Sequence, residues 1–389
     1  MSTAFPRTAL RTPAAAGAFR GWERFDILLV LPALGLVAIG LVLIYSGSAS
    51  TYDGPVASIN NPVMRQVAFA TIGIAAMLVA ARFDYHHLTH YWWLLYIISI
   101  VSLVAILLIG QTQFGSTRWF NLGPIQVQPS EFAKLAVIVA MARYFQDRGG
   151  DAKDLRSLLI SLAIVAPIAG LVFIEPDLGT TIVFGAIWIG MVSVAGVNRN
   201  HLIVLGAMFV AILPFIWAFA VADYQVERIS VLIDPYEDRQ GLGAGYNNIQ
   251  SQLAIGSGGL TGKGLRNGDQ TQLEYLKVPT KDFVFSVLAE EFGFVGAMAL
   301  FTLFVLLLLR AIRVAALAGD PAGQLIAVGI VVLILMQAFV NLAVNLSLFP
   351  VTGIPLPFVS QGGSSLVSLF GSLGILQSIV MRHRAYRQN

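Results

Sequence analysis

The sequence predicts an all-α polytopic integral membrane protein, with about ten transmembrane helices and a large extracytoplasmic loop between helices 7 and 8. Hydrophobic residues make up 57% of the 389 residues and charged residues only 12%, which leaves too little charged surface for a soluble protein. The apolar residues gather in segments long enough, or nearly so, to cross roughly 30 Å of hydrocarbon. Such segments, separated by polar ones, are typical of a helical bundle in a bilayer.

The ten apolar segments cover residues 27–47, 63–81, 92–110, 131–145, 157–174, 179–196, 202–222, 283–309, 323–348 and 363–381. The fourth is short and contains charge, and the break before the sixth, residues 175–179, is shorter than an ordinary loop. We expect residues 25–389 to form a single membrane domain. A basic, disordered cytoplasmic tail, residues 1–24, precedes it and lacks the apolar run of a cleaved signal peptide.

The distribution of basic residues predicts the orientation. Of the 24 Lys and Arg residues, 15 fall in the segments that would face the cytoplasm, 3 in short outer segments and 6 in the long loop at about residues 223–282, whose length weakens its influence. Both termini are therefore expected in the cytoplasm and the long loop outside, in a multi-pass membrane protein.

Composition also excludes several kinds of chemistry and partner. The chain has no cysteine, so disulfides, thiolate catalysis and cysteine metal sites are excluded. A net charge of +3 is too small to indicate nucleic acid as a partner, and membrane lipids are the expected surroundings.

Asp282 is the first candidate catalytic residue. It lies where the long polar loop turns into the eighth apolar segment, and a carboxylate at the edge of a membrane helix is a functional candidate because charge near lipid is costly. Glu290 follows eight residues later, an offset of about 80° on a 3.6-residue helix, so the two carboxylates would share a cavity. The structural alternative for Asp282 is a helix cap.

Three further groups of polar residues are expected in the same outer region. Glu131 and Lys134, three residues apart, can pair on one helix face near Arg118, and Asp177 lies in the short break with Glu175. Either group could instead hold helices together. Residues 353–365, with Ser364, predict a broken entry to the last helix. The residues alone therefore predict an outward-facing polar cavity, which fits a transporter as well as an enzyme.

The sequence resembles the SEDS family of bacterial cell-wall proteins (shape, elongation, division and sporulation) over nearly its whole length after the tail. The matching segments are residues 44–46, 128–134, 175–180, 243–247, 254–264, 282–283, 290–291 and 360–365. Within the family, residues 254–259 and 352–358 look more like the elongation branch than the division branch.

The resemblance implies a peptidoglycan glycosyltransferase that polymerises lipid II during cell elongation with a class B penicillin-binding protein. Asp282 matches the family's catalytic aspartate and would be the general base for the acceptor hydroxyl, in an inverting displacement of the undecaprenyl pyrophosphate. Glu131, Lys134, Asp177 and Ser364 match family cavity residues. The leaving pyrophosphate would be neutralised by Lys134, Arg118 and Lys281, or by a divalent cation (Mg²⁺ or Mn²⁺) that Asp282 holds with a neighbouring carboxylate.

The chain departs from the family pattern at two places. Thr280-Lys281 stands where the family usually has His-Thr, and Gln361 stands where it usually has Tyr, so the local substrate contacts are open. The alternative function is a lipid II flippase. Because a transport path must be polar through the full depth of the bilayer, whereas the ionisable residues gather on the outer side, the sequence favours the enzyme.

Overall fold

The computed structural model describes residues 22–49, 60–110, 118–122, 125–149, 153–220 and 244–387, together with positions 52, 54, 55, 58, 226 and 230–232. Long helices occupy all ten of the expected apolar segments. They are α1 (Ile27–Gly47), α2 (Pro62–Arg82), α4 (Trp92–Ile109), α5 (Pro129–Arg148), α6 (Leu155–Ile174), α7 (Leu178–Val194), α8 (Arg199–Ala220), α12 (Val284–Leu317), α13 (Pro321–Asn345) and α14 (Gly363–Arg387). The all-α prediction is confirmed. Most of the expected tail, residues 1–21, and much of the first half of the long loop lie outside the described residues.

Seven of these helices are long and apolar enough to cross a membrane, and α7 is a shorter apolar helix. Their outward side chains are large and apolar: Leu108 and Ile109 of α4 are 78% and 74% exposed. Exposed apolar surface on this scale is expected where the surroundings are lipid rather than water. The described residues therefore form a multi-pass membrane protein.

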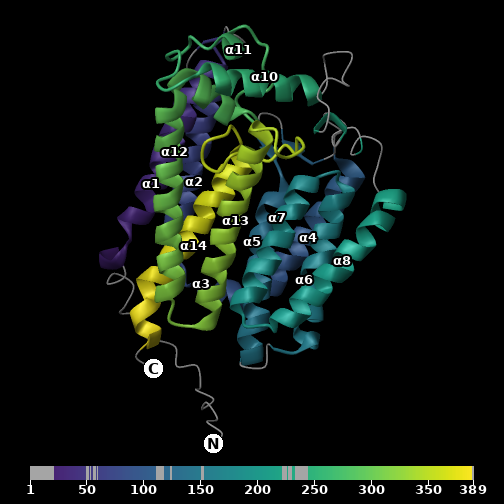
Figure 1. The fold of residues 1–389 in the computed structure, drawn as a ribbon. Coiled ribbons are helices and arrows are strands. Elements are labelled where there is room, and N and C mark those ends of the chain that lie inside the picture. Colours follow the sequence, from purple (N-terminus) through teal and green to yellow (C-terminus); the bar gives the residue numbers. More distant parts are fainter. Residues whose placement is uncertain are drawn as a thin grey trace, which may run out of the picture.

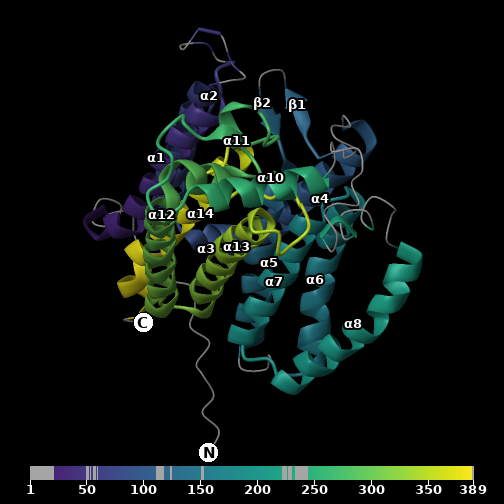
Figure 2. The same cartoon turned by 45° about the horizontal axis from the view of Figure 1, so that its top comes forward.

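The helices run alongside one another, and the short helices α10 (Ala244–Ser257) and α11 (Asp269–Gln272) lie across one end of the bundle (Figures 1 and 2). The start of α1 and the end of α14 lie at the opposite end, where Gln377 Nε2 donates to the carbonyl of Asp26 at 2.7 Å. Shorter elements complete the described chain: a 3₁₀ turn (Trp22–Arg24), α3 (Tyr85–His90), β1 (Phe120–Leu122) and β2 (Ile125–Val127).

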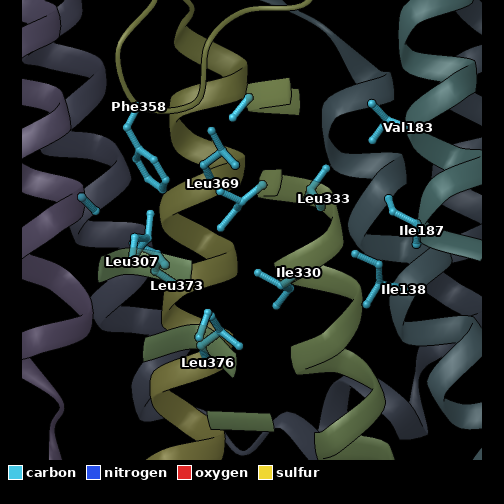
Figure 3. Packing of buried hydrophobic residues seen from close by; sticks show 14 of the residues in the cluster. Ile138, Val183, Ile187, Leu307, Ile330, Leu333, Phe358, Leu369, Leu373 and Leu376 are labelled. Carbon is cyan, nitrogen blue, oxygen red and sulfur yellow. The ribbon is translucent and has the colours of Figure 1, made fainter. Parts of the chain in front are cut away.

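The buried core lies between α13 and its neighbours. Leucines at successive turns of α14 face α12 and α13, and the other side of α13 faces α5 and α7 (Figure 3). The residues that show this in Figure 3 are Leu307, Ile330, Leu333, Leu369, Leu373, Leu376, Ile138, Val183 and Ile187. At this depth the bundle is apolar and close-packed.

The helix that follows Asp282 is broken, whereas the sequence predicts an uninterrupted one. Gly293 within α12 has φ 62° and ψ −157°, a conformation that favours glycine. Residues 258–268, between α10 and α11, contain five glycines and form the glycine-rich loop. This loop supplies the hydrogen bonds that the break removes: the amides of Lys263 and Gly264 donate to the carbonyls of Glu290 and Glu291, each at 3.0 Å. In return, the amides of residues 294 and 295 donate to the carbonyls of residues 259 and 260, at 3.0 and 3.1 Å. These four backbone hydrogen bonds to the glycine-rich loop therefore replace the ones that α12 lacks at Gly293.

Candidate active site

A cavity of about 410 Å³ lies at the end of the bundle that α10 covers. Segments far apart in the sequence form its walls: the start of α2, the β1–β2 hairpin, the turn before α12, residues 351–355 and the entry to α14. Its charged and hydroxyl-bearing lining includes Arg65, Arg118, Lys281, Asp282, Ser364 and Ser365. Asp282 is the only Asp or Glu among the described lining residues.

Asp282 lies in the turn before α12, whose first helical residue is Val284. The N-cap position belongs to Phe283, so Asp282 is not the N-cap residue of α12. Its backbone carbonyl accepts hydrogen bonds from Asn341 Nδ2 at 3.0 Å and Asn345 Nδ2 at 2.9 Å. Asp282 itself lines the polar cavity.

Lys281 and Ser364 also line the cavity, as the sequence predicts. The carbonyl of Lys281 accepts from Ser360 Oγ at 2.5 Å. Ser364 Oγ donates to the carbonyl of Gln126 at 3.1 Å and accepts from the amide of Gln128 at 3.0 Å. These contacts join the turn before α12 and the β1–β2 hairpin, an element the sequence analysis missed, to the entry of α14.

The two departures from the family pattern contact each other. Thr280 Oγ1 donates to Gln361 Oε1 at 2.9 Å, and the amide of Gln361 donates to the carbonyl of Thr280 at 2.9 Å. Gln361 lines the cavity next to Asp282. Thr280 and Gln361 are therefore hydrogen-bond partners in the wall that includes Asp282.

Arg118 connects the cavity to the short break between α6 and α7. Its Nε donates to the carbonyl of Glu175 at 3.2 Å, another guanidinium nitrogen donates to the carbonyl of Pro176, and Nη1 lies 3.8 Å from Asp177 Oδ1. The side chain is 8% exposed and lines the cavity. A buried, oriented guanidinium is suited to bind phosphate oxygens.

Asp177 lies behind the cavity wall, so its expected place in the cavity is wrong. Its carboxylate caps α7, accepting from the amide of Thr180 at 3.1 Å and from Thr180 Oγ1 at 2.9 Å. It reaches the lining through Gln128, whose Nε2 lies 3.5 Å from Oδ2, and through Arg118, whose Nη1 lies 3.8 Å from Oδ1. The capping requirement of a helix that begins one residue later explains why this carboxylate turns inward.

Glu131 and Lys134 form the expected pair on one face of α5, with Lys134 Nζ 2.7 Å from Glu131 Oε1. Their side chains are 2% and 1% exposed, and neither lines the cavity. The expected role of Lys134 in the cavity is therefore not supported by its position: its ammonium is enclosed and directed at Glu131. The carbonyl of Glu131 accepts from Ser368 Oγ of α14 at 2.8 Å, so the pair lies at a helix–helix contact.

Glu290 lies beneath the glycine-rich loop, and the prediction that it shares a cavity with Asp282 is wrong. Its carboxylate, 0% exposed, accepts from Lys263 Nζ at 3.1 Å, from the amide of Gln270 at 3.0 Å and from Thr271 Oγ1 at 3.0 Å. The expected rotation of about 80° between Asp282 and Glu290 assumes that both lie in one helix. It does not apply because Asp282 precedes the first turn of α12. Desolvation lowers the pKa of Lys263, but hydrogen bonds to Asp269 and Glu290 outweigh it, so the pKa is raised.

The described residues do not form a metal site of their own. No group of three or more His, Cys, Asp or Glu side chains in the described part of the chain is arranged to hold an ion, and Asp282 has no second carboxylate beside it in the cavity lining. The expected pairing of Asp282 with a neighbouring carboxylate is therefore not found among these residues.

Sequence reasoning missed two sets of residues. Arg65, at the start of α2, lines the cavity, and Asn341 and Asn345 contact Asp282 from α13. A signal for both was available: a charge in the second apolar segment, and two amides one helical turn apart in the ninth, are costly in a membrane and point to a partner.

Comparison with family models matches residues 26–385 to the FtsW/RodA/SpoVE family of cell cycle proteins. The peptidoglycan glycosyltransferase MrdB of Escherichia coli (strain K12) is 36% identical over 360 residues, which are 92% of this chain and 94% of that protein. Stage V sporulation protein E of Bacillus subtilis (strain 168) is 38% identical over 357 residues, covering 91% and 96% of the two chains.

Solved structures show the same fold. One chain from a study of the structural coordination of polymerisation and crosslinking by a peptidoglycan synthase complex has a TM-score of 0.78 and 30% identity, covering 94% of this chain and 99% of that one. The rod shape determining protein RodA of Thermus thermophilus has a TM-score of 0.68 and 28% identity, covering 95% and 99%. The similarity therefore extends over nearly the whole membrane domain.

Proposed function

Since the chain belongs to the FtsW/RodA/SpoVE family of cell cycle proteins, we propose that it is a peptidoglycan glycosyltransferase that polymerises lipid II during cell elongation, with Asp282 as the general base. The observation that carries this proposal is a single carboxylate set among cations in one cavity. Asp282 lines that cavity together with Arg65, Arg118 and Lys281. A lone base beside several fixed positive charges is suited to sugar transfer from a pyrophosphate donor.

In the proposed reaction, the acceptor sugar hydroxyl attacks the anomeric carbon of the donor. The new bond joins that oxygen to the anomeric carbon, and the bond from this carbon to the pyrophosphate oxygen breaks on the opposite side, which inverts the configuration. The hydroxyl proton passes to the Asp282 carboxylate. The leaving pyrophosphate takes the electron pair, and the guanidinium groups of Arg118 and Arg65 with the ammonium of Lys281 neutralise its charge.

The described cavity lining offers a divalent cation one carboxylate, that of Asp282, so the protein alone does not supply a full set of ligands. Mg²⁺ is commonly bound by one or two carboxylates together with substrate phosphates and water. We propose that Asp282 would be the protein carboxylate that holds such a metal, and that the metal, when bound, would add to the charge neutralisation.

The position of the cavity agrees with a lipid-linked substrate. It lies at one end of a bundle whose outer surface is apolar, so the polyprenyl chain can remain in the bilayer while the sugars and pyrophosphate occupy the cavity. The Lys and Arg distribution supports placing this end at the outer face of the cytoplasmic membrane, with both termini in the cytoplasm.

A class B penicillin-binding protein is the proposed partner. One structural neighbour comes from a peptidoglycan synthase complex that coordinates polymerisation with crosslinking. Polymerisation and transpeptidation of the same strand would then take place in one assembly.

The flippase alternative is disfavoured by the packing below the cavity. A transport path needs polar lining through the full depth of the bilayer. The described helices α5, α7, α13 and α14 instead bury many leucine, isoleucine and valine side chains between them (Figure 3).

The test is lipid II polymerisation in detergent, with and without a cognate class B partner, comparing wild type with Asp282→Asn. The substitution keeps size and hydrogen bonding but removes the base. Asp147→Asn is the matched control, because Asp147 is 57% exposed and pairs with Arg143 near the other end of α5. We expect loss of polymer only from Asp282→Asn. Undiminished polymer from that variant would exclude Asp282 as the base, and no polymer from the partner-bound wild type would favour the flippase.

A further inference from the structure

Two buried asparagines stand one turn apart at the end of α13. Asn341 is 1% exposed and Asn345 is 0% exposed, in a helix that is otherwise largely apolar. A primary amide buried in a membrane helix is costly unless its donors and acceptor are satisfied. The contacts of these two amides therefore indicate why they are there.

Both amides bind the backbone of the proposed base. Asn341 Nδ2 donates to the carbonyl of Asp282 at 3.0 Å and Asn345 Nδ2 donates to the same oxygen at 2.9 Å. The two amides also contact each other, with Asn345 Nδ2 3.3 Å from Asn341 Oδ1. The carbonyl oxygen of Asp282 thus accepts hydrogen bonds from two buried side chains of α13.

Asn345 also holds the first turn of α12. Its Oδ1 accepts from the amide of Ser286 at 3.1 Å and from Ser286 Oγ at 2.7 Å. Phe283, at the N-cap position, makes no side-chain capping hydrogen bond, so Asn345 supplies from α13 the cap that α12 lacks. Asp282 is therefore fixed from both sides of the turn that carries it.

Asn341 connects this turn to another cavity wall. Its Nδ2 also donates to the carbonyl of Ile354 at 2.9 Å, within the segment whose neighbours Gly353 and Pro355 line the cavity. Asn341 thus joins the Asp282 turn directly to that wall. Ser251 of α10 closes the cluster, its Oγ donating to the carbonyl of Asn345 at 2.6 Å.

We propose that Asn341 and Asn345 are positioning residues for the Asp282 carboxylate. They fix the backbone from which this side chain reaches the acceptor hydroxyl, and neither asparagine touches the reacting atoms or lines the cavity itself. This inference rests on the proposed role of Asp282 as the base. A displacement of about 1 Å at a reacting group can reduce the rate about 10²-fold, so loss of the amides should lower kcat far more than it changes KM.

The test compares Asn345→Leu and Asn341→Leu, which keep side-chain size but remove the hydrogen bonds. Gln337→Leu is the matched control: Gln337 is one turn earlier on α13, 1% exposed, and its Oε1 has no hydrogen-bond partner. With wild-type Tm in detergent, we expect each Asn variant to lose about 10²-fold in kcat for lipid II polymerisation, with KM within about threefold. The control should keep both constants. Asn345→Ser replaces the leucine variant if the latter unfolds, because a serine hydroxyl is too short to reach the Asp282 carbonyl.

The outcomes separate the two proposals. Full activity of folded Asn345→Leu and Asn341→Leu beside an inactive Asp282→Asn would overturn the positioning role alone. An active Asp282→Asn would overturn the role of the base, whatever the asparagine variants do. A rise in KM with unchanged kcat would also contradict positioning, because it would place the asparagines in substrate binding.

Discussion

Replacing Lys134 with methionine would leave the Glu131 carboxylate without its partner inside the protein. The ammonium and carboxylate are 2.7 Å apart and their side chains are 1% and 2% exposed, so solvent does not screen the pair. Removing one member of such a pair costs about 3–5 kcal/mol, because the remaining charge stays buried and uncompensated. That loss is a large part of the usual stability of a folded protein, about 5–15 kcal/mol. Lys134→Met should therefore show a clearly lowered Tm in detergent.

The double variant Glu131→Leu/Lys134→Met separates a structural pair from a functional one. Replacing both charges with apolar residues of similar size is often neutral or stabilising, so the double variant should recover most of the Tm lost by Lys134→Met. Because neither residue lines the cavity, the recovered protein should also polymerise lipid II. Additive Tm losses would refute the buried-pair reasoning. A stable but inactive double variant would show that the pair takes part in the reaction.

Three further substitutions test other contacts. Gly293→Ala should destabilise the protein by more than the roughly 1–3 kcal/mol of backbone strain, because its Cβ would lie 2.7 Å from the Leu260 carbonyl; Gly185→Ala, with open space around it, should be neutral by Tm. Arg118→Lys should lower polymerisation about tenfold or more, since one ammonium cannot replace the guanidinium's contacts with two carbonyls; unchanged rates would contradict this. Lys263→Met should lower Tm by a constant amount between pH 7 and 9. The pKa of Lys263 is raised in the folded protein, so its stabilising effect is complete below about pH 10.5 and is lost only as pH rises through the folded-state pKa. If the Tm difference between wild type and Lys263→Met shrank below pH 9, the stabilising contacts of charged Lys263 with Asp269 and Glu290 would be contradicted.

The transmembrane helices could be predicted from the sequence because their limits are set locally. A helix in hydrocarbon must satisfy its own backbone and extend far enough to cross it, so apolar length alone located segments such as 27–47, which α1 matches in full. Asp282 could be found for a related reason. A carboxylate at the edge of such a segment is costly, and the residues around it resemble a known family. The orientation in the membrane stays a prediction from the Lys and Arg distribution.

Only the tertiary structure decided which polar residues meet in the cavity. Asp177 and Glu290 look equivalent to Asp282 in the sequence, yet Asp177 caps α7 and Glu290 is enclosed by the glycine-rich loop and α11. The contacts of Asn341 and Asn345 with Asp282 join residues about sixty positions apart. The physical reason is that hydropathy fixes where a chain enters and leaves the bilayer, whereas the direction of each buried polar side chain depends on which partners the packed helices bring within hydrogen-bond distance.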